Sequence, residues 1–152
     1  MRIAIRFGLP AERGELEDLQ RRASLVAKRY RADLLAHPEA IHLPLSQLAE
    51  KRVRVAEIAG RVVGFSAVLP KTAGIFDLDG LFVEPDRWRR GIGRALIADA
   101  LEQIGAQGGT ALEVVANPAA EAFYKEMKFE VCGDAQTQFG PAQIMRLTLH
   151  SA

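Results

Sequence analysis

The segment that most constrains the fold of this chain is residues 81–94, where a strand-like run leads through two glycines into an amphipathic helix. Four arginines lie within eight residues around those glycines: Arg87, Arg89, Arg90 and Arg94. The first turn of a helix carries partial positive charge and unpaired amides, so it favours acidic side chains over arginines. Because glycine lets a ligand approach the backbone closely, the segment predicts a strand, a tight loop and a helix start that bind a diphosphate.

Two other phosphate motifs do not fit this segment. The chain contains no G-x-x-x-x-G-K-[ST] sequence, which excludes a P-loop. The dinucleotide-binding pattern G-x-G-x-x-G needs a small residue at the position of Leu96, so that pattern fails as well. A surface helix that begins with glycine and arginine by chance is the alternative to an anion site.

The composition is that of one globular domain. With 152 residues, 49% of them hydrophobic and 26% charged, the chain is long enough to bury a core, and we expect a single domain over residues 1–152. The formal net charge of +1 argues against a large nucleic-acid-binding face. No apolar run approaches the ~18 residues of a membrane span, so no membrane partner is expected.

The cysteine and histidine content predicts a cytoplasmic protein without a metal. Residues 2–7 lack the long apolar stretch of a secretory signal and indicate a first strand. The single cysteine, Cys132, excludes an internal disulfide and suits a reducing compartment. No histidine forms a partner pattern with it, so we expect a core residue rather than a nucleophile. The four side chains that could ligate zinc lack the required spacing: His37, His42, His150 and Cys132.

Hydrophobic periodicity predicts alternating strands and helices. The expected helices are one beginning at Pro10, one or two short ones within residues 31–50, one over residues 91–104 and one beginning at Asn117-Pro118. The expected strands are residues 2–7, 53–58, 61–69, 75–83, 111–115, 129–133 and 143–149. This order predicts a mixed sheet with helices packed on it.

Residues 88–93 resemble the pyrophosphate motif of the GNAT superfamily of acyl-CoA-dependent N-acetyltransferases. That motif is [QR]-x-x-G-x-[GA], and the six positions here are Trp88-Arg89-Arg90-Gly91-Ile92-Gly93. Trp88 stands where the family has Gln or Arg. The family binds phosphates there mainly through backbone amides, so the substitution affects a side-chain contact and leaves the cradle in place.

Residues 117–129 are similar to the N-x-x-A-x-x-F/L-Y-x-x-x-G-F run of the same family. Lys128 stands where the family has a helix-ending glycine. A left-handed conformation at Lys128 would cost on the order of 1 kcal/mol, which concerns stability rather than catalysis. The order of elements also follows the family plan, so the resemblance covers nearly the whole chain and is weakest before residue 50.

The resemblance implies a fold and an activity. The expected fold is α/β (an α+β mixed sheet) and GNAT-like, with a central, mostly antiparallel twisted sheet of about six or seven strands flanked by about four helices. The expected activity is transfer of acetyl from acetyl-CoA, as cosubstrate, to an amine by direct attack and without a metal. The acceptor would be a small-molecule or peptide amine, and homodimers are common in the superfamily.

The resemblance also implies which residues bind the cosubstrate. Leu81 to Val83 would hold the pantetheine arm by backbone hydrogen bonds, with the Val83 amide near the thioester carbonyl. The implied cofactor-binding residues are Leu81, Phe82, Val83, Arg89, Arg90, Gly91, Ile92, Gly93, Arg94, Asn117 and Tyr124.

Tyr124 is the expected catalytic acid. It follows Asn117 by seven residues, about two helical turns, so the two are expected on one helix face. By the resemblance, its hydroxyl protonates the departing thiolate. An ordinary pKa of about 10 keeps a tyrosine protonated at neutral pH, as an acid must be.

Asp77 is the expected base or ammonium ligand. On a strand over residues 75–83, alternation puts Asp77, Asp79, Leu81 and Val83 on one face. The resemblance favours Asp77, because many family members carry an acidic residue at its position. Asp79 and a chain of water molecules stay open as the base.

Two further function classes stay open at the level of the sequence. A non-catalytic acyl-CoA-binding or sensing domain would keep the cradle but would have no need for Tyr124 beside Asn117. A nicotinamide-dinucleotide domain is disfavoured by Leu96. The sequence does not identify the acceptor amine or the preferred acyl chain.

Overall fold

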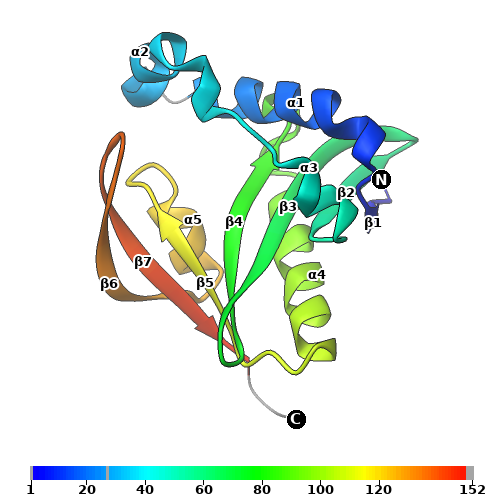
Figure 1. Ribbon diagram of the computed structural model, residues 1–152, viewed down its shortest axis with the longest axis vertical. Coiled ribbons are helices and arrows are strands. Elements are labelled where there is room, and N and C mark those ends of the chain that lie inside the picture. Colours follow the sequence, from blue (N-terminus) through cyan, green and yellow to red (C-terminus); the bar gives the residue numbers. More distant parts are fainter. Residues whose placement is uncertain (1, 27, 150–152) are drawn as a thin grey trace. The chain divides into compact units, whose positions relative to one another are not determined.

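The computed structural model describes residues 2–26 and 28–149, and these form seven strands and five α-helices (Figure 1). The strands are β1 (Ala4–Phe7), β2 (Val53–Ile58), β3 (Arg61–Thr72), β4 (Ile75–Val83), β5 (Ala111–Ala116), β6 (Glu130–Thr137) and β7 (Gly140–Thr148). The α-helices are α1 (Arg13–Leu25), α2 (Lys28–Ala36), α3 (Leu45–Ala49), α4 (Ile92–Ala106) and α5 (Glu121–Glu126). Three short 3₁₀ helices are η1 (Pro10–Glu12), η2 (Pro38–Ala40) and η3 (Pro85–Arg87).

The strands form one sheet in the order β1-β2-β3-β4-β5-β7-β6. β4 and β5 are parallel, and the helix α4 lies between them in the chain, as a parallel crossover requires. The pairs β1–β2, β2–β3, β5–β7 and β6–β7 are antiparallel. The predicted mixed, mostly antiparallel sheet flanked by helices is therefore confirmed.

Element boundaries differ from the sequence predictions at the loops. β3 runs to Thr72 rather than ending at residue 69, and the β6–β7 hairpin is longer than expected. Its turn lies at residues 138–139, so Gly140 and Pro141 belong to β7 instead of to a loop. Periodicity fades at the exposed end of a hairpin, which is why the pattern gave strands that are too short there.

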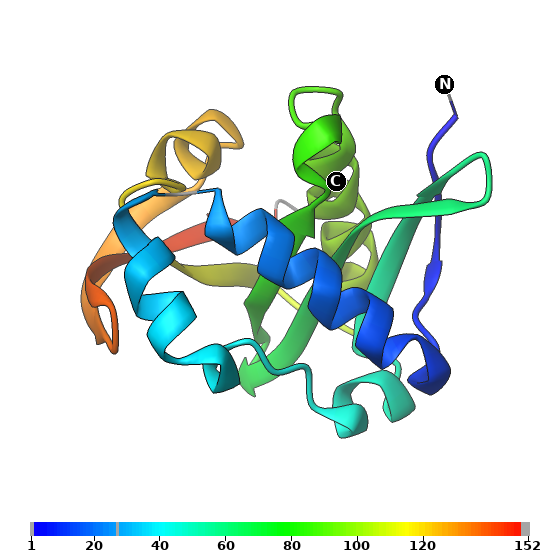
Figure 2. The same cartoon turned by 90° about the horizontal axis from the view of Figure 1, so that it is seen from above.

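The described chain divides into two compact units, Met1–Ala67 with Gly80–Ile97, and Val68–Asp79 with Ala98–Ala152. In the first unit, apolar side chains pack against both faces of β2 and β3, with α1 on one face and the start of α4 on the other (Figure 2). The cluster that includes α1 consists of Leu16, Leu19, Leu43, Leu48, Val53, Val55, Val62, Phe65 and Ala67, with Phe82 against it. The cluster that includes α4 consists of Ala56, Ile58, Val63, Ile92 and Leu96, with Ile3, Ile5, Leu81 and Val83 against it.

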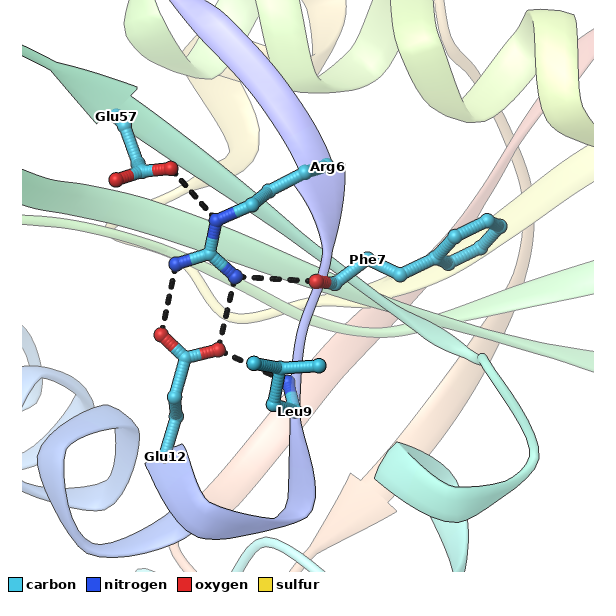
Figure 3. Close-up of polar contacts among 5 residues, drawn as sticks. All are labelled: Arg6, Phe7, Leu9, Glu12 and Glu57. Carbon is cyan, nitrogen blue, oxygen red and sulfur yellow. Dashed lines mark hydrogen bonds and ion pairs between the residues drawn. The ribbon is translucent and has the colours of Figure 1, made fainter. Parts of the chain in front are cut away.

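An ion cluster fixes the first strand and the entry into α1 (Figure 3). The Arg6 guanidinium donates to both carboxylate oxygens of Glu12, at 2.8 and 2.7 Å, and to Oε1 of Glu57 on β2 at 2.6 Å. Glu12 also accepts the Leu9 N–H at 2.9 Å. Arg6 holds the pKa of the Glu12 carboxyl below its usual range. The cluster links β1 to β2 and to the turn before α1.

In the second unit, β5, β7 and β6 lie side by side with α5 behind them (Figure 1). Five of the six residues of β5 are apolar, and Leu112 and Val114, which share one face of the strand, are buried. Their cross-strand partners on β7 are Leu147 and Met145. Glu113, between these two residues, therefore lies on the opposite face of the sheet.

Gly64 on β3 is a point of close approach that sets the position of α4. A Cβ atom there would lie 3.0 Å from the Phe82 carbonyl oxygen and 3.2 Å from Cγ2 of Ile92. Because backbone and buried side chains must both move, we predict that Gly64→Ala lowers the free energy of unfolding by about 1–3 kcal/mol. Urea unfolding at pH 7 measures the change.

Gly14→Ala is the matched control for this substitution. Gly14 lies in α1, and a Cβ atom there would meet nothing within 4 Å. Since alanine is favoured over glycine in a helix, the control should be neutral or more stable by about 0.5–1 kcal/mol. Equal effects of the two substitutions would contradict the close packing at Gly64.

Candidate active site

The loop between β4 and α4 is held by a hydrogen bond from one of its own side chains, Trp88, to the end of β4. After Glu84 the chain forms η3, and the Trp88 indole N–H then turns back and donates to the Val83 carbonyl oxygen at 2.9 Å. Trp88 is 45% exposed, so it holds the loop by this hydrogen bond more than by burial. This hydrogen bond ties the loop back to the end of β4.

The backbone at the start of α4 has the conformation that glycine favours. Gly91 has a φ of +81°, and a Cβ atom there would meet nothing within 4 Å. Arg89 also adopts a positive φ, of 65°. The first hydrogen bond of the helix runs from the Ala95 N–H to the Gly91 carbonyl at 3.0 Å. The amides of Ile92 and Gly93 precede it and have no acceptor within the helix.

Apolar packing holds this helix start in place. Ile92 and Leu96 are almost fully buried and pack with Val63 of β3 and with Leu81 and Val83 of β4. Arg89, Arg90 and Arg94, by contrast, are exposed, and the first turn of α4 contains no acidic residue. The structure thus places Ile92, at the start of α4, against Leu81 and Val83 in the first unit. That residues 81–83 and 89–94 bind a cosubstrate stays a prediction.

Glu84, directly after β4, was not identified from the sequence. Its N–H donates to the Val63 carbonyl at 2.8 Å, and the residue as a whole is only 5% exposed. Arg22 of α1 donates to both carboxylate oxygens, at 2.7 and 2.8 Å. Arg22 holds the pKa of Glu84 below its usual range. The sequence signal that could have indicated a functional or structural role for Glu84 is a single acidic residue between the apolar end of β4 and Pro85.

Tyr124 lies in the second unit and is buried, with 7% of its surface exposed. Its ring makes edge contacts with Phe123 and Phe129, each with ring centroids 5.2 Å apart. Burial raises the pKa of the Tyr124 phenol above its ordinary value. The hydroxyl therefore stays protonated across the physiological range, as a proton donor must.

Asn117 does not begin a helix, which corrects the sequence interpretation. α5 begins at Glu121, after a turn over residues 118–120. The Asn117 side-chain oxygen accepts the Ala120 N–H at 3.1 Å and so stabilises that turn. The seven-residue spacing to Tyr124 therefore does not place the two residues on one helix face.

Asp77 on β4 lies beside Glu113 on β5 in the parallel register of the two strands. It is half-buried, whereas Asp79 is exposed. Burial, followed by the neighbouring carboxylates of Asp79 and Glu113, raises the pKa of Asp77, while Lys71 opposes this effect. Asp77 thus has the environment expected of a base or of a partner for a cation.

Two other sequence interpretations have different outcomes. Lys128 adopts a φ of 76°, so it does take the left-handed conformation that the family's glycine would take. Cys132, expected in the core, is instead exposed. It lies at a register shift between Val131 and Gly133, where an extra residue in β6 disrupts the alternation.

The cradle residues belong to the first unit, and Asp77, Asn117 and Tyr124 belong to the second. That they form one site, and that Asp77 shares a face with Leu81 and Val83, stay predictions. Among residues 2–26 and 28–149, no helix is long and apolar enough to cross a membrane. Over the same residues, no three His, Cys, Asp or Glu side chains gather where a metal ion could bind.

The chain matches the acetyltransferase (GNAT) domain over residues 35–149. No curated protein sequence matches it. Solved structures similar in fold include the PaiA N-acetyltransferase of Thermoplasma acidophilum in complex with coenzyme A, with a TM-score of 0.79, 17% identity, and coverage of 98% of this chain and 100% of that one.

Two other similar structures have different acceptors in their names. The ribosomal-protein-S18-alanine N-acetyltransferase of Escherichia coli has a TM-score of 0.72, 21% identity, and coverage of 99% of this chain and 96% of that one. An aminoglycoside 6'-N-acetyltransferase complexed with coenzyme A has a TM-score of 0.74, 17% identity, and coverage of 100% and 99%. At these identities the likeness establishes the fold alone.

The family match covers more than half of the chain, and the fold agrees with it. The chain therefore belongs to the GNAT family of acetyltransferases, which confirms the resemblance drawn from residues 88–93 and 117–129.

The Arg22–Glu84 pair gives a pH-dependent prediction. At pH 7, Arg22→Met should lower the free energy of unfolding by about 1–3 kcal/mol, because it leaves a buried carboxylate without its partner. The folded pKa of Glu84 is lowered, so the pair stabilises above the unfolded pKa of about 4.3. This contribution is lost as the pH falls through the folded pKa, and the two proteins should converge in stability.

Urea unfolding in steps from pH 7 to pH 2 measures the convergence. Arg21→Met is the control in the same helix, because Arg21 pairs with Asp18 at 3.4 Å on an exposed surface. Its effect should be about 0.5 kcal/mol or less. A difference between wild type and Arg22→Met that stays constant with pH would show that Glu84 is not the group responsible.

Proposed function

We propose that this chain is an acetyl-CoA-dependent N-acetyltransferase that transfers acetyl to an amine by direct attack. The observation that carries the proposal is the start of α4, where Gly91 is in a left-handed conformation with open space around it. The amides of Ile92 and Gly93, which follow it, have no acceptor within the helix. A diphosphate fits such a site, since it accepts several N–H bonds and favours the positive end of the helix dipole.

The cosubstrate would be held by the residues that the family resemblance assigns. The amides of Ile92, Gly93 and Arg94 would bind the diphosphate, and the charges of Arg89 and Arg90 would lie at its rim. Leu81, Phe82 and Val83 would hold the pantetheine arm through backbone groups, with Asn117 as a further contact. Coenzyme A in the solved structures of two relatives supports this choice of cosubstrate.

The chemistry needs two proton transfers. The attacking amine loses a proton as its C–N bond to the acetyl group forms, and Asp77, directly or through water, would accept it. The C–S bond breaks, and Tyr124 would protonate the leaving thiolate. The raised pKa of Asp77 brings this carboxylate closer to the basicity that proton removal requires.

We further propose a single cytoplasmic domain over residues 1–152 that acts on a small-molecule or peptide amine. A basic face for nucleic acid and a metal play no part in this mechanism. The apolar packing of Ile92 supports a rigid cradle, and the family match supports the class of reaction. A homodimer would be compatible with it.

Substitution of Gly91 tests the cradle. Gly91→Ala should raise the Kd for acetyl-CoA about tenfold or more, because the added methyl group lies where the phosphates approach. Calorimetric titration measures the affinity. Gly108→Ala is the matched control, since Gly108 has a φ of +79° and nothing within 4 Å of a Cβ atom. Both variants carry the same backbone strain, of about 1 kcal/mol, and only Gly91→Ala should lose affinity.

Tyr124→Phe tests the catalytic acid. Turnover at saturating substrates should fall by roughly 10²-fold, whereas the Kd for acetyl-CoA should stay within about twofold, because only the hydroxyl is removed. Release of free thiol measures the rate over a broad amine panel. Unchanged turnover would remove Tyr124 from the mechanism. Tight acetyl-CoA binding without turnover on any amine would favour a non-catalytic sensing domain.

A further inference from the structure

Four charged side chains from neighbouring strands gather on one face of the sheet in the second unit. They are Lys71 of β3, Asp77 of β4, Glu113 of β5 and Arg146 of β7. Asp77 pairs with Glu113 in register, and Glu113 pairs with Arg146. Residues paired laterally across strands point to the same side of a sheet, so these side chains share a face. We refer to them as the Glu113 cluster.

Glu113 is buried, with 4% exposed, and binds both cations of the cluster. Its Oε1 accepts from Nζ of Lys71 at 2.6 Å, and its Oε2 accepts from Nε of Arg146 at 2.7 Å, with a second bond from Nη2. These two cations hold the pKa of Glu113 below its usual range. A fixed anion therefore orients an ammonium and a guanidinium.

The two cations also face solvent and have donors to spare. The side chains of Lys71 and Arg146 are 45% and 41% exposed. An ammonium has three donors and a guanidinium five, and the bonds to Glu113 use one and two of them. Lys71, Arg146 and Glu113 together carry one positive charge. Glu130 of β6, which is exposed, pairs in register with Arg146 and adds a negative charge on that side. An anion would therefore bind through the spare donors of the two cations rather than through a net positive charge.

Asp77 adds one negative charge next to that positive one. It lies one strand away from Glu113 and within electrostatic range of Lys71. These four side chains are neutral in sum. Because β4 lies between β3 and β5, Lys71 lies on one side of Asp77, and Glu113 and Arg146 follow on the other. A small ligand with both an ammonium and a carboxylate matches this alternation of charges.

We propose that the acceptor is a small amino acid, whose ammonium binds Asp77 and whose carboxylate binds Lys71 and Arg146. The inference rests on the proposed function, in which Asp77 receives the amine. Neighbouring strands lie about 4.8 Å apart, so the distance from Asp77 to Arg146 across β5 is on the order of 10 Å at the backbone. Both α-amino and ω-amino acids have the required groups, and the test separates them.

The alternative is a purely structural ion cluster that ties β3, β5 and β7 together. That role predicts a loss of stability when a partner is removed, but no preference among substrates. The decisive quantity is therefore the selectivity of the wild-type enzyme, followed by its loss in variants that still bind acetyl-CoA.

The first experiment compares each amino acid with its own carboxamide in the thiol-release assay. One set contains α-amino acids, and the other contains ω-amino acids such as β-alanine and 4-aminobutyrate. The carboxamide keeps the shape and removes the charge, and an α-carboxamide also has the less basic, more readily deprotonated amine. We expect kcat/KM to be at least about tenfold higher for the acid in one set, which identifies the spacing of the two groups.

Variants then test whether Lys71 and Arg146 cause the preference for the acid over its carboxamide. Arg146→Met and Lys71→Met should each lower the ratio of kcat/KM for the acid to kcat/KM for the carboxamide about tenfold, mainly through KM for the acid. The ratio is the readout because Lys71 also lowers the pKa of Asp77, so its removal affects the turnover of both substrates. Arg21→Met, on the exposed face of α1, is the control and should change neither. Arg146→Met removes a partner of the buried Glu113 carboxylate and could destabilise the fold. Arg146→Lys is therefore the second variant. It keeps the charge and loses the planar fork, so it should lose part of the preference.

The outcomes separate the two proposals. Turnover of amines without preference for the acid would overturn the amino-acid assignment and leave the acetyltransferase intact. Failure of acetyl-CoA to bind the wild type would overturn the proposed function and this assignment with it. If acetyl-CoA binds without turnover, amide NMR titration with each amino acid and its carboxamide decides whether the cluster binds the acid. Shifts at residues 71, 77 and 146 with the acid alone support the assignment, and equal or absent shifts overturn it.

Discussion

The burial of Ile92 and Leu96 against β3 and β4 is the interaction on which the proposed cosubstrate site depends. These two side chains pack with Val63 and so hold the first turns of α4 in the apolar cluster. Gly64 allows this close packing, because a Cβ atom at its position would crowd Ile92 and Leu96. The polar groups of the same turns are left on the outer side. Packing energy thus fixes the position of amides that themselves gain nothing from packing.

The end of β4 is fixed from a second direction by charge. Glu84 is held by the Val63 carbonyl through its amide and by Arg22 through its carboxylate, so α1 is tied to the strand that leads into the cradle. A buried carboxylate is costly unless it is paired, which makes this arrangement intolerant of small changes. Glu113 is organised by the same principle in the second unit, where it orients two partly exposed cations.

Sequence reasoning located most elements, including the start of α4 where the cradle is proposed, because each has a local signature. Alternation gave β4 with its observed bounds, and glycines beside arginines marked the start of α4. Asn117 and Cys132 were misplaced because a turn can imitate a helix cap and a bulge interrupts alternation. Ion pairs such as Arg22–Glu84 join residues far apart in the chain, so no local pattern reveals them. The Glu113 cluster needs strand register, which periodicity does not supply.

An amide NMR titration of the whole chain with coenzyme A tests whether the diphosphate binds at the start of α4. We expect the largest changes on the amides of residues 91–94, because the diphosphate would accept their N–H groups. Smaller changes should follow along β4. Binding that leaves these amides unchanged and shifts amides elsewhere would contradict the placement of the cosubstrate at the start of α4.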